Sequence, residues 1–346
     1  MSNVKILRRP SNDATKETSL SRYSDKVERC LREGGIDFDE IFFSIDASSG
    51  YLDLFVHGLI KPFVSCIKAG SKKNVILATD ELCGIFFPFM RGRKIAVIHH
   101  VPNKGEYRGG VYHTLWKLVS KTSLKHADAI IAISEQTKEE MLERFKANPE
   151  KVVLITNGAD NIFDIRKEVK KEKTIGCMGA LIQRKNVLST IQAFKLLTDY
   201  PGMSDHSLEI CGKGPEKGKL LEAAADLGIS EKVKFVSDLD KDEIVRFYNR
   251  SELIFNTSLH EGIGMVTLEA QKCGVPVLHL EEAKIPKEVT KYSIACRDDA
   301  DMAEKAYGLL SNREEYENTA KTSKEYADSY GNDFCKQYIK IIHGAK

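Results

Sequence analysis

Short apolar segments alternate with longer segments of helical periodicity along nearly all of the 346 residues. An apolar run of about four to eight residues fits a strand buried on both faces, and the helical segment after it fits a crossover connection. This alternation constrains the fold most, because strands joined by helical crossovers form parallel sheets. The sequence therefore predicts an α/β protein with two doubly wound, Rossmann-like sheets.

The alternation divides the strands into two sets, one in each half of the chain. We expect strands near 3–8, 39–44, 74–79, 94–100, 128–133 and 151–155, and then near 174–178, 207–211, 232–236, 252–256 and 276–280. We expect helices near 18–33, 50–69, 109–126, 135–146, 185–197, 215–227, 240–249 and 265–273. After about residue 298 only helical patterns remain.

The charged segment DIRKEVKKEK at 164–173 has almost no core residues and marks a linker between the two sheets. A chain of this length also fits about two domains. We expect one Rossmann-like domain over 1–163, a second over 164–330, and a terminal helix over 331–346 that packs across both. A ligand cleft is expected between the two sheets, where carboxyl ends of strands and helix N-termini can face a ligand.

Charge and cysteine content narrow the classes of function. The net charge is only +2, so we expect no nucleic-acid partner. The first ten residues lack the apolar core of a signal peptide, and no apolar run approaches the roughly 20 residues that span a bilayer. The eight cysteines show no paired spacing, which favours reduced thiols. We therefore expect a cytoplasmic protein.

The region 51–125 is strongly basic, with twelve Lys or Arg against four Asp or Glu. It forms either an ordinary solvated surface or a site that faces anionic lipid or an anionic acceptor. Within it, His113, Lys117, Lys121 and Lys125 recur every four residues. Such a helix either rests on a membrane surface or packs its apolar face in the core. Peripheral contact with the cytoplasmic membrane face is therefore one of two interpretations.

The segment SLHEGIGMVTLEAQKCGVPVL at 258–278 carries the strongest functional signal. It follows an apolar strand, and Gly262 and Gly264 allow backbone N–H groups to approach a ligand just before a helix begins. A helix N-terminus in this position attracts phosphate. Glu261 and Glu269 are too far apart for a tight acid–base pair, but each carboxylate can accept hydrogen bonds from a diol.

The pattern Glu261-x7-Glu269 within EGIGMVTLEAQKCGVPV resembles the E-x7-E signature of the retaining GT-B glycosyltransferases of family four. The resemblance covers roughly 75–346 and includes HADAIIAISEQTKEEM and ITNGAD. It implies a GT-B fold, in which an acceptor-side N-terminal domain and a nucleotide-sugar-binding C-terminal domain face a central cleft. In that family the first Glu and the Gly-x-Gly backbone hold the sugar and diphosphate, and the second Glu holds the ribose.

A second segment, IGCMGALIQRKNVLSTIQAF at 175–194, places Arg184 and Lys185 at the start of a helix. Two cations at a helix N-terminus interact unfavourably with the helix dipole, so their presence fits an anion bound between them. The alternative is that both are ordinary solvated basic residues. The segment is similar to the family's diphosphate clamp, with Lys185 at the clamp lysine. Ala180 stands where the family usually has arginine, and Asn186 where it often has glycine.

The third segment, LEICGKGPEKGKL at 208–220, ends a strand in Gly212-Lys-Gly214. Lys217 stands where a dinucleotide-binding G-x-G-x-x-G needs its third glycine, and no offset gives a P-loop, so neither motif is supported. The segment is similar to the family's strand and turn that line the nucleotide pocket.

Two histidines, His99 and His100, end the apolar strand IAVIHHV. A histidine on such a strand is often structural, but the resemblance places a donor-contacting histidine here, with His99 the better match and His100 the alternative. The short patterns Asp238-Leu-Asp240 and Asp37-Phe-Asp39 match the D-x-D of metal-dependent GT-A enzymes. Two-letter patterns are common and the first suits a helix cap, so we expect no metal and no cofactor besides the sugar donor.

The resemblance thus implies retaining transfer of a hexose from a nucleoside-diphosphate sugar to a hydroxyl of a glycan or lipid-linked glycan. The residues with an implied catalytic role are His99 or His100, Lys185 and Glu261. The implied donor-binding residues are Gly179, Arg184, Lys185, Gly212, Gly214, Glu261, Gly262, Ile263, Gly264, Met265, Val266 and Glu269. The alternatives are a nucleotide-sugar epimerase or hydrolase of the same fold and a catalytically silent sugar-nucleotide-binding subunit.

Overall fold

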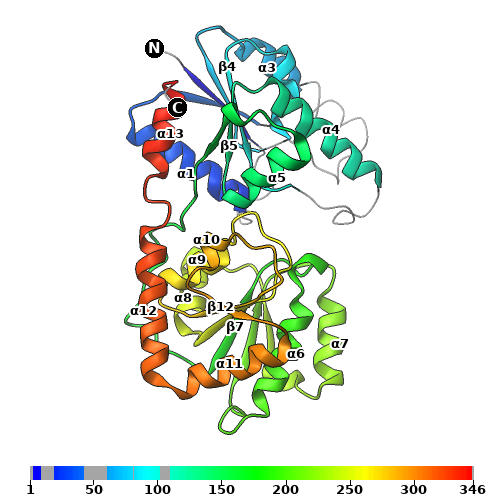
Figure 1. Ribbon diagram of the computed structural model, residues 1–346, viewed down its shortest axis with the longest axis vertical. Helices are drawn as coiled ribbons and strands as arrows, with labels where there is room; N and C mark the ends of the chain where they lie inside the picture. Colours follow the sequence, from blue (N-terminus) through cyan, green and yellow to red (C-terminus); the bar gives the residue numbers. More distant parts are fainter. Residues whose placement is uncertain (1–2, 9–18, 43–60, 81, 102–109, 345–346) are drawn as a thin grey trace. The chain divides into compact units, whose positions relative to one another are not determined.

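The structure of the protein is a computed structural model that describes residues 3–8, 19–42, 61–80, 82–101 and 110–344 (Figure 1). The chain divides into two compact units. Unit 1 comprises residues 1–157 and 333–346, and unit 2 comprises residues 158–332. Each unit contains one six-stranded sheet whose paired strands are parallel. The predicted α/β class with two doubly wound sheets is confirmed.

Unit 1 has the strand order β2-β1-β3-β4-β5-β6. Its inner strands β3 and β5 read VILA and AIIA and are buried throughout, as expected for strands covered by helices on both faces. The strands are β1 Val4–Arg8, β2 Phe38–Phe42, β3 Val75–Ala78, β4 Arg93–Ile98, β5 Ala129–Ala132 and β6 Val152–Leu154. The helices, with 3-10 helices written η, are α1 Ser19–Glu33, α3 Lys61–Ala69, η2 Cys83–Phe89, α4 Gly110–His126, α5 Glu135–Phe145, η3 Pro149–Lys151 and α13 Phe334–Ile342.

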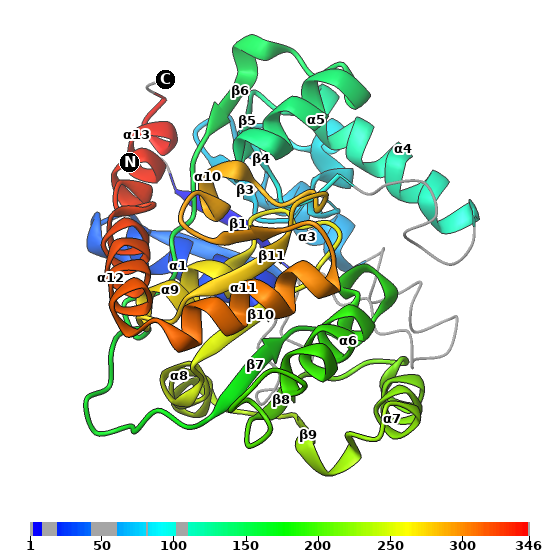
Figure 2. The same cartoon turned by 60° about the horizontal axis from the view of Figure 1, so that its bottom comes forward.

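The C-terminal helix α13 packs against α1 within unit 1 (Figures 1 and 2). A disulfide joins Cys30 on α1 to Cys335 on α13, with their Cα atoms 4.9 Å apart. The expectation of eight reduced thiols is wrong for this pair, because the two cysteines are 305 positions apart and meet only when α13 docks on α1. The predicted terminal helix over 331–346 corresponds to α13, and residues 333–346 group with unit 1.

Unit 2 has the strand order β12-β11-β10-β7-β8-β9, so consecutive strands proceed outward from β7 in one direction and then outward from β10 in the other. This is the order of a dinucleotide-binding type of doubly wound sheet. The strands are β7 Thr174–Met178, β8 Ser207–Cys211, β9 Val233–Val236, β10 Leu253–Asn256, β11 Val277–Leu280 and β12 Ile294–Cys296. The helices are η4 Gln183–Lys185, α6 Val187–Thr198, α7 Lys217–Asp226, η5 Ser230–Lys232, α8 Lys241–Arg250, α9 Met265–Lys272, α10 Lys287–Thr290, α11 Asp299–Ser311 and α12 Arg313–Ser329.

The charged segment 164–173, which we expected to link the two sheets, is hydrogen-bonded within unit 2. Arg166 N donates to Asn249 Oδ1 at 2.7 Å, and Lys171 Nζ donates to the carbonyl of Ser251 at 2.6 Å. Burial lowers the pKa of Lys171 to about 8. The division between the units falls before this segment, at 157/158 rather than at 163/164.

The expected elements agree with the observed ones except at a few places. Strand β12, the short helix α10 and the 3-10 helices η2, η3 and η5 have no counterpart among the expected elements, and residues 50–60 of the expected helix near 50–69 lie outside the described residues. Among the helices that the structure describes, none is long and apolar enough to span a membrane.

Candidate functional site

The sheet of unit 2 changes direction between its neighbouring strands β7 and β10. In doubly wound sheets, ligands bind outside the carboxyl ends of the strands at this kind of point. Two loops leave the sheet here, residues 179–186 after β7 and residues 257–264 after β10. The predicted clamp and the first part of the E-x7-E signature therefore lie on adjacent loops.

The side chain of Glu261 holds the two loops together. Glu261 is 8% exposed, forms an ion pair with Lys185 through Oε1, and has Arg184 Nη1 at 3.4 Å from Oε2. Burial by itself raises the pKa of Glu261, but the charges of Lys185 and Arg184 outweigh that effect and leave its pKa below the ordinary value. Two cations and one carboxylate give this cluster a formal charge of +1, which suits an anionic ligand.

Backbone hydrogen bonds fix the same two loops. Leu259 N donates to the carbonyl of Arg184 at 2.9 Å, and Thr257 Oγ1 donates to that of Asn186 at 2.9 Å. Asn186 has a φ of +48°, a left-handed conformation that asparagine tolerates better than most residues. This conformation explains how asparagine can stand where glycine is common in the clamp.

The glycines after β8 permit a close approach of the clamp loop. A Cβ on Gly212 would lie 1.8 Å from the carbonyl oxygen of Gly179, and one on Gly214 would lie 2.2 Å from that of Leu181. Leu181 N also donates to the carbonyl of Lys213 at 2.7 Å. These two glycines, expected to line the nucleotide pocket, thus support the backbone of the loop that carries Arg184 and Lys185.

Helix α9 begins directly after the glycine-rich loop. Gly264 caps it with a φ of +88° and is buried, as is the side chain of Ile263. Met265 and Val266 form the first turn, and Gly262 precedes the cap.

Glu269 lies one turn further along α9 and is almost fully buried. Its Oε2 accepts a hydrogen bond from Tyr248 Oη at 2.9 Å, and Tyr248 Oη also lies 3.1 Å from Met178 Sδ at the end of β7. Tyr248 therefore links Glu269 to the end of β7, beside the start of the clamp loop. Sequence reasoning missed Tyr248, because nothing in its surroundings indicates a contact with a residue 21 positions later.

His99 and His100 follow β4 in unit 1 and are half-buried. His99 Nε2 lies 2.8 Å from the carbonyl oxygen of Thr79, and its ring meets Tyr23 edge-on. The structure thus places the predicted histidines at the carboxyl end of a strand, as expected.

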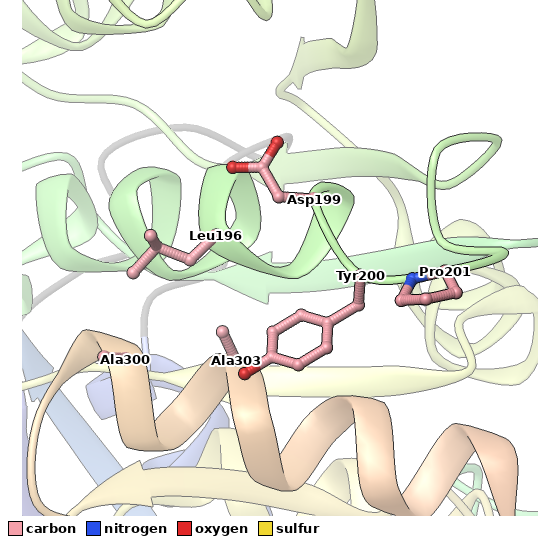
Figure 3. Close-up of a pocket in the computed structure, with 6 residues that line it drawn as sticks. All are labelled: Leu196, Asp199, Tyr200, Pro201, Ala300 and Ala303. Carbon is pink, nitrogen blue, oxygen red and sulfur yellow. The ribbon is translucent and has the colours of Figure 1, made fainter.

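Two other features of unit 2 have structural roles or lie away from this cluster. Asp240 caps α8 in a capping box with Glu243, and Asp238 forms an exposed ion pair with Lys213. A depression of about 300 Å³ lies between α6 and α11 (Figure 3). Tyr200 and Pro201 line the depression and follow the C-terminal end of α6, whereas Lys185 precedes the N-terminal end of α6. The depression therefore lies away from the cluster.

Comparisons with known proteins identify the family and the fold. Residues 159–326 match the family model described as glycosyl transferases group 1, and residues 79–161 match the model described as glycosyltransferase family 4. The O-antigen chain mannosyltransferase RfbU of Salmonella typhimurium is 22% identical over 273 residues, 79% of this chain and 74% of its own length. Several other curated relatives are matched over less than two thirds of their own length.

Two solved structures share the fold over 99% of this chain. Sucrose-phosphate synthase from Thermosynechococcus elongatus has a TM-score of 0.80 at 17% identity, and 98% of that chain is covered. Anabaena HepE in complex with UDP has a TM-score of 0.76 at 14% identity, with 100% of that chain covered. With the two family models and the paired Rossmann-like sheets, these likenesses establish that the chain belongs to the group 1 glycosyltransferases and has the GT-B fold.

Proposed function

We propose that this glycosyltransferase moves a hexose from a nucleoside-diphosphate sugar to a hydroxyl of a glycan or lipid-linked glycan, with retention of configuration and without a metal. The observation that supports it most is the cluster of Arg184, Lys185 and Glu261 at the turning point of the unit 2 sheet. A nucleotide-sugar donor is supported by HepE, whose structure contains UDP, and a glycan acceptor by RfbU, which is named for an O-antigen chain.

The proposed reaction develops negative charge on the departing diphosphate. Lys185, Arg184 and the N-terminus of α9 at Gly264 would stabilise that charge as donors already in place. In the structure Glu261 holds Lys185 beside the loop, so the cation is positioned before any donor arrives. Glu261 would also orient the sugar, Glu269 would bind the ribose, and His99 would contact the sugar near the reacting carbon.

We favour departure and attack on the same face of the sugar. The bond between the anomeric carbon and the diphosphate oxygen breaks, the acceptor oxygen bonds to that carbon on the same face, and the leaving phosphate takes the acceptor proton. This order needs no covalent nucleophile from the protein and accounts for retention.

A thermal-shift screen tests the donor half of this proposal. A ligand that binds only the folded chain raises its stability, by about 2.7 kcal/mol at a concentration 100 times its Kd. We expect one of UDP, GDP and ADP, and the matching nucleotide sugar, to raise the melting temperature. No shift with any of them would remove the basis of the proposal. Product analysis with that donor then separates transfer to an acceptor from epimerisation and hydrolysis.

We further propose that the protein is cytoplasmic and binds reversibly to an anionic membrane face through an apolar patch on unit 1. The patch consists of Val64, Ile67 and Phe89, which are 42, 48 and 61% exposed. Val64 and Ile67 lie on α3, and Phe89 lies on η2. Phe63 on α3 connects the two elements, because the centroid of its ring lies 5.3 Å from that of Phe89. Four exposed cations belong to the same region: Lys68, Lys72, Lys73 and Arg91.

These four cations form no ion pair with any part of the chain that the structure describes, so their charges remain available to lipid phosphates. On α4, Lys117, Lys121 and Lys125 are also exposed, whereas Ser120 and Leu124 are buried. The described part of that helix therefore turns one face to the core and presents its lysines outward.

Vesicle flotation tests the membrane proposal. The chain should float with vesicles that contain phosphatidylglycerol and not with pure phosphatidylcholine. The triple variant Val64→Ser/Ile67→Ser/Phe89→Ser should lose flotation, and Leu221→Ser, an equally exposed position on unit 2, should retain it. Equal flotation of the triple variant would contradict this assignment, as would absence of wild-type flotation.

A further inference from the structure

Two buried tyrosines connect the C-terminal helix to His99 within unit 1. Tyr23 on α1 and Tyr338 on α13 are 2% and 0% exposed, and their hydroxyl oxygens lie 2.6 Å apart. The ring of Tyr23 meets the imidazole of His99 edge-on, with centroids 4.5 Å apart and planes at 85°. A continuous set of contacts therefore runs from α13 through α1 to His99.

A second set of contacts holds the other side of the imidazole. His99 Nε2 lies 2.8 Å from the carbonyl oxygen of Thr79, and because a carbonyl only accepts, Nε2 carries the hydrogen in this contact. Ser24 Oγ donates to Thr79 Oγ1 at 2.8 Å, and Thr79 Oγ1 donates to the carbonyl of Leu7. Two adjacent residues of α1 thus hold His99 in place. Tyr23 contacts the imidazole, and Ser24 is hydrogen-bonded to Thr79, whose carbonyl accepts the hydrogen bond from the imidazole.

Helix α13 is itself firmly placed on α1. Phe334 packs edge-on against Tyr23 with ring centroids 5.6 Å apart, and the Cys30–Cys335 disulfide joins the two helices next to this contact. Arg93 donates to the carbonyls of Ile341 and Ile342 at the end of the helix. Burial raises the pKa of both Tyr23 and Tyr338, so both phenols keep their protons and one hydroxyl donates to the other.

We infer that Tyr23 and Tyr338 are positioning residues, through which the C-terminal helix fixes the orientation of His99 and keeps its Nε2–H directed at the carbonyl of Thr79. The functional consequence rests on the proposed role of His99 in transfer, but the positioning itself does not. The tyrosines act through His99 and need no contact with a substrate. The last helix of the chain thereby becomes a structural component of the site on unit 1.

Single removal of either hydroxyl tests the inference in the full chain. Tyr338→Phe leaves the buried hydroxyl of Tyr23 without this partner, and Tyr23→Phe does the converse for Tyr338. An unsatisfied buried hydroxyl destabilises its surroundings, whereas removal of both partners is close to neutral. The double variant Tyr23→Phe/Tyr338→Phe should therefore restore what each single variant disturbs.

The readout is the imidazole resonance of His99 in protein labelled with 15N-histidine and assigned by its loss in His99→Gln. In the wild type we expect the Nε2–H tautomer with a slowly exchanging proton. In each single variant that proton should exchange about 5- to 30-fold faster, and in the double variant the rate should return to within about threefold of the wild type. Tyr316→Phe, which loses a half-buried hydroxyl that donates to the carbonyl of Glu252 in unit 2 at 2.8 Å, is the control and should leave His99 unchanged.

Unchanged exchange in both folded single variants, or a double variant that fails to recover, overturns the positioning inference. Turnover with the donor found by thermal shift is measured separately. A single variant with lower kcat and unchanged KM supports both the positioning and the role of His99. Altered exchange with normal turnover supports the positioning and overturns the proposed role of His99 in transfer.

Discussion

The two units place opposite charge balances around their strand-end clusters. In unit 2 two cations share one buried carboxylate, a formal charge of +1, whereas in unit 1 one buried cation shares three carboxylates, a formal charge of −2. The cluster of unit 2 is Arg184, Lys185 and Glu261, and the cluster of unit 1 is Arg8, Asp25, Glu28 and Glu40. Two units with the same type of doubly wound sheet therefore differ in their clusters. The cluster of unit 2 suits an anionic ligand, and the cluster of unit 1 does not.

Removal of the shared cation in unit 1 should have the largest effect. Arg8 is buried at the end of β1, with Asp25 at 2.8 Å and Glu40 at 3.1 Å. Arg8→Met would leave Glu28, whose side chain is 13% exposed, with only the exposed Arg32 at 3.9 Å beside it, and loss of one member of a buried pair costs about 3–5 kcal/mol. We expect that decrease in the free energy of unfolding measured with urea. Arg313→Met, in an exposed pair with Glu317, should change it by less than about 0.5 kcal/mol.

Removal of one cation in unit 2 should impair function, while Arg184 remains beside Glu261 to offset part of its charge. Loss of a donor that stabilises developing charge costs about 3–4 kcal/mol, so Lys185→Ala should lower kcat roughly a hundred- to thousandfold. Lys195→Ala, which removes a surface pair with Asp199 on α6, should retain wild-type turnover. Near-normal turnover of Lys185→Ala would show that the charge balance of unit 2 does not serve the leaving group.

A smaller effect is expected from crowding the backbone that supports the clamp. Gly212→Ala places a Cβ 1.8 Å from the carbonyl oxygen of Gly179, so the clamp loop must shift. Such overpacking costs about 1–3 kcal/mol, and nucleotide affinity should fall with it in a titration by calorimetry. Gly218→Ala, where a Cβ meets no atom within 4 Å, should preserve affinity. Equal affinities would mean that the loop adapts without moving its cations.

The smallest expected effect is a difference between the two clusters in how their contribution to stability depends on pH. Burial, together with the Glu40 carboxyl, raises the pKa of Glu28 from its ordinary 4.5 to about 7. An acid with a raised folded pKa contributes stability below its unfolded pKa, and that contribution is lost as the pH rises through about 7. Glu261 has a lowered pKa, so its contribution is present above the ordinary value and is lost as the pH falls.

We therefore expect Glu28→Gln to be more stable relative to the wild type at about pH 8 than at about pH 5. The difference between the two pH values should be about 1 kcal/mol, because solvent partly screens the cluster. Glu261→Gln should show the reverse trend, with its largest loss at neutral pH. Unfolding by urea at both pH values measures each difference. If the stability of both variants relative to the wild type changed in the same direction between the two pH values, the opposed charge balances of the two clusters would be contradicted.

Local sequence signals predicted the fold and much of the candidate site. The buried strands are continuous apolar runs, and Lys185 and Glu261 lie on loops directly after two of them, so strand prediction placed both at carboxyl ends. Contacts between distant side chains gave no such signal. Tyr248 with Glu269, Tyr23 with His99 and Cys30 with Cys335 each join residues whose neighbourhoods in sequence are unrelated. Strand β12 has no apolar residue on either side, because Ser293 precedes it and Arg297 follows, whereas the equally short β6 lies in the longer apolar run VVLI.

The Cys30–Cys335 disulfide has a consequence for the covalent topology of the chain. Unit 2 is inserted between two parts of unit 1, and the disulfide closes a ring that contains all of unit 2. While this bond is intact, a single proteolytic cut anywhere in residues 158–332 opens the ring but leaves one covalent molecule. Two cuts are needed before any part of unit 2 can leave the chain.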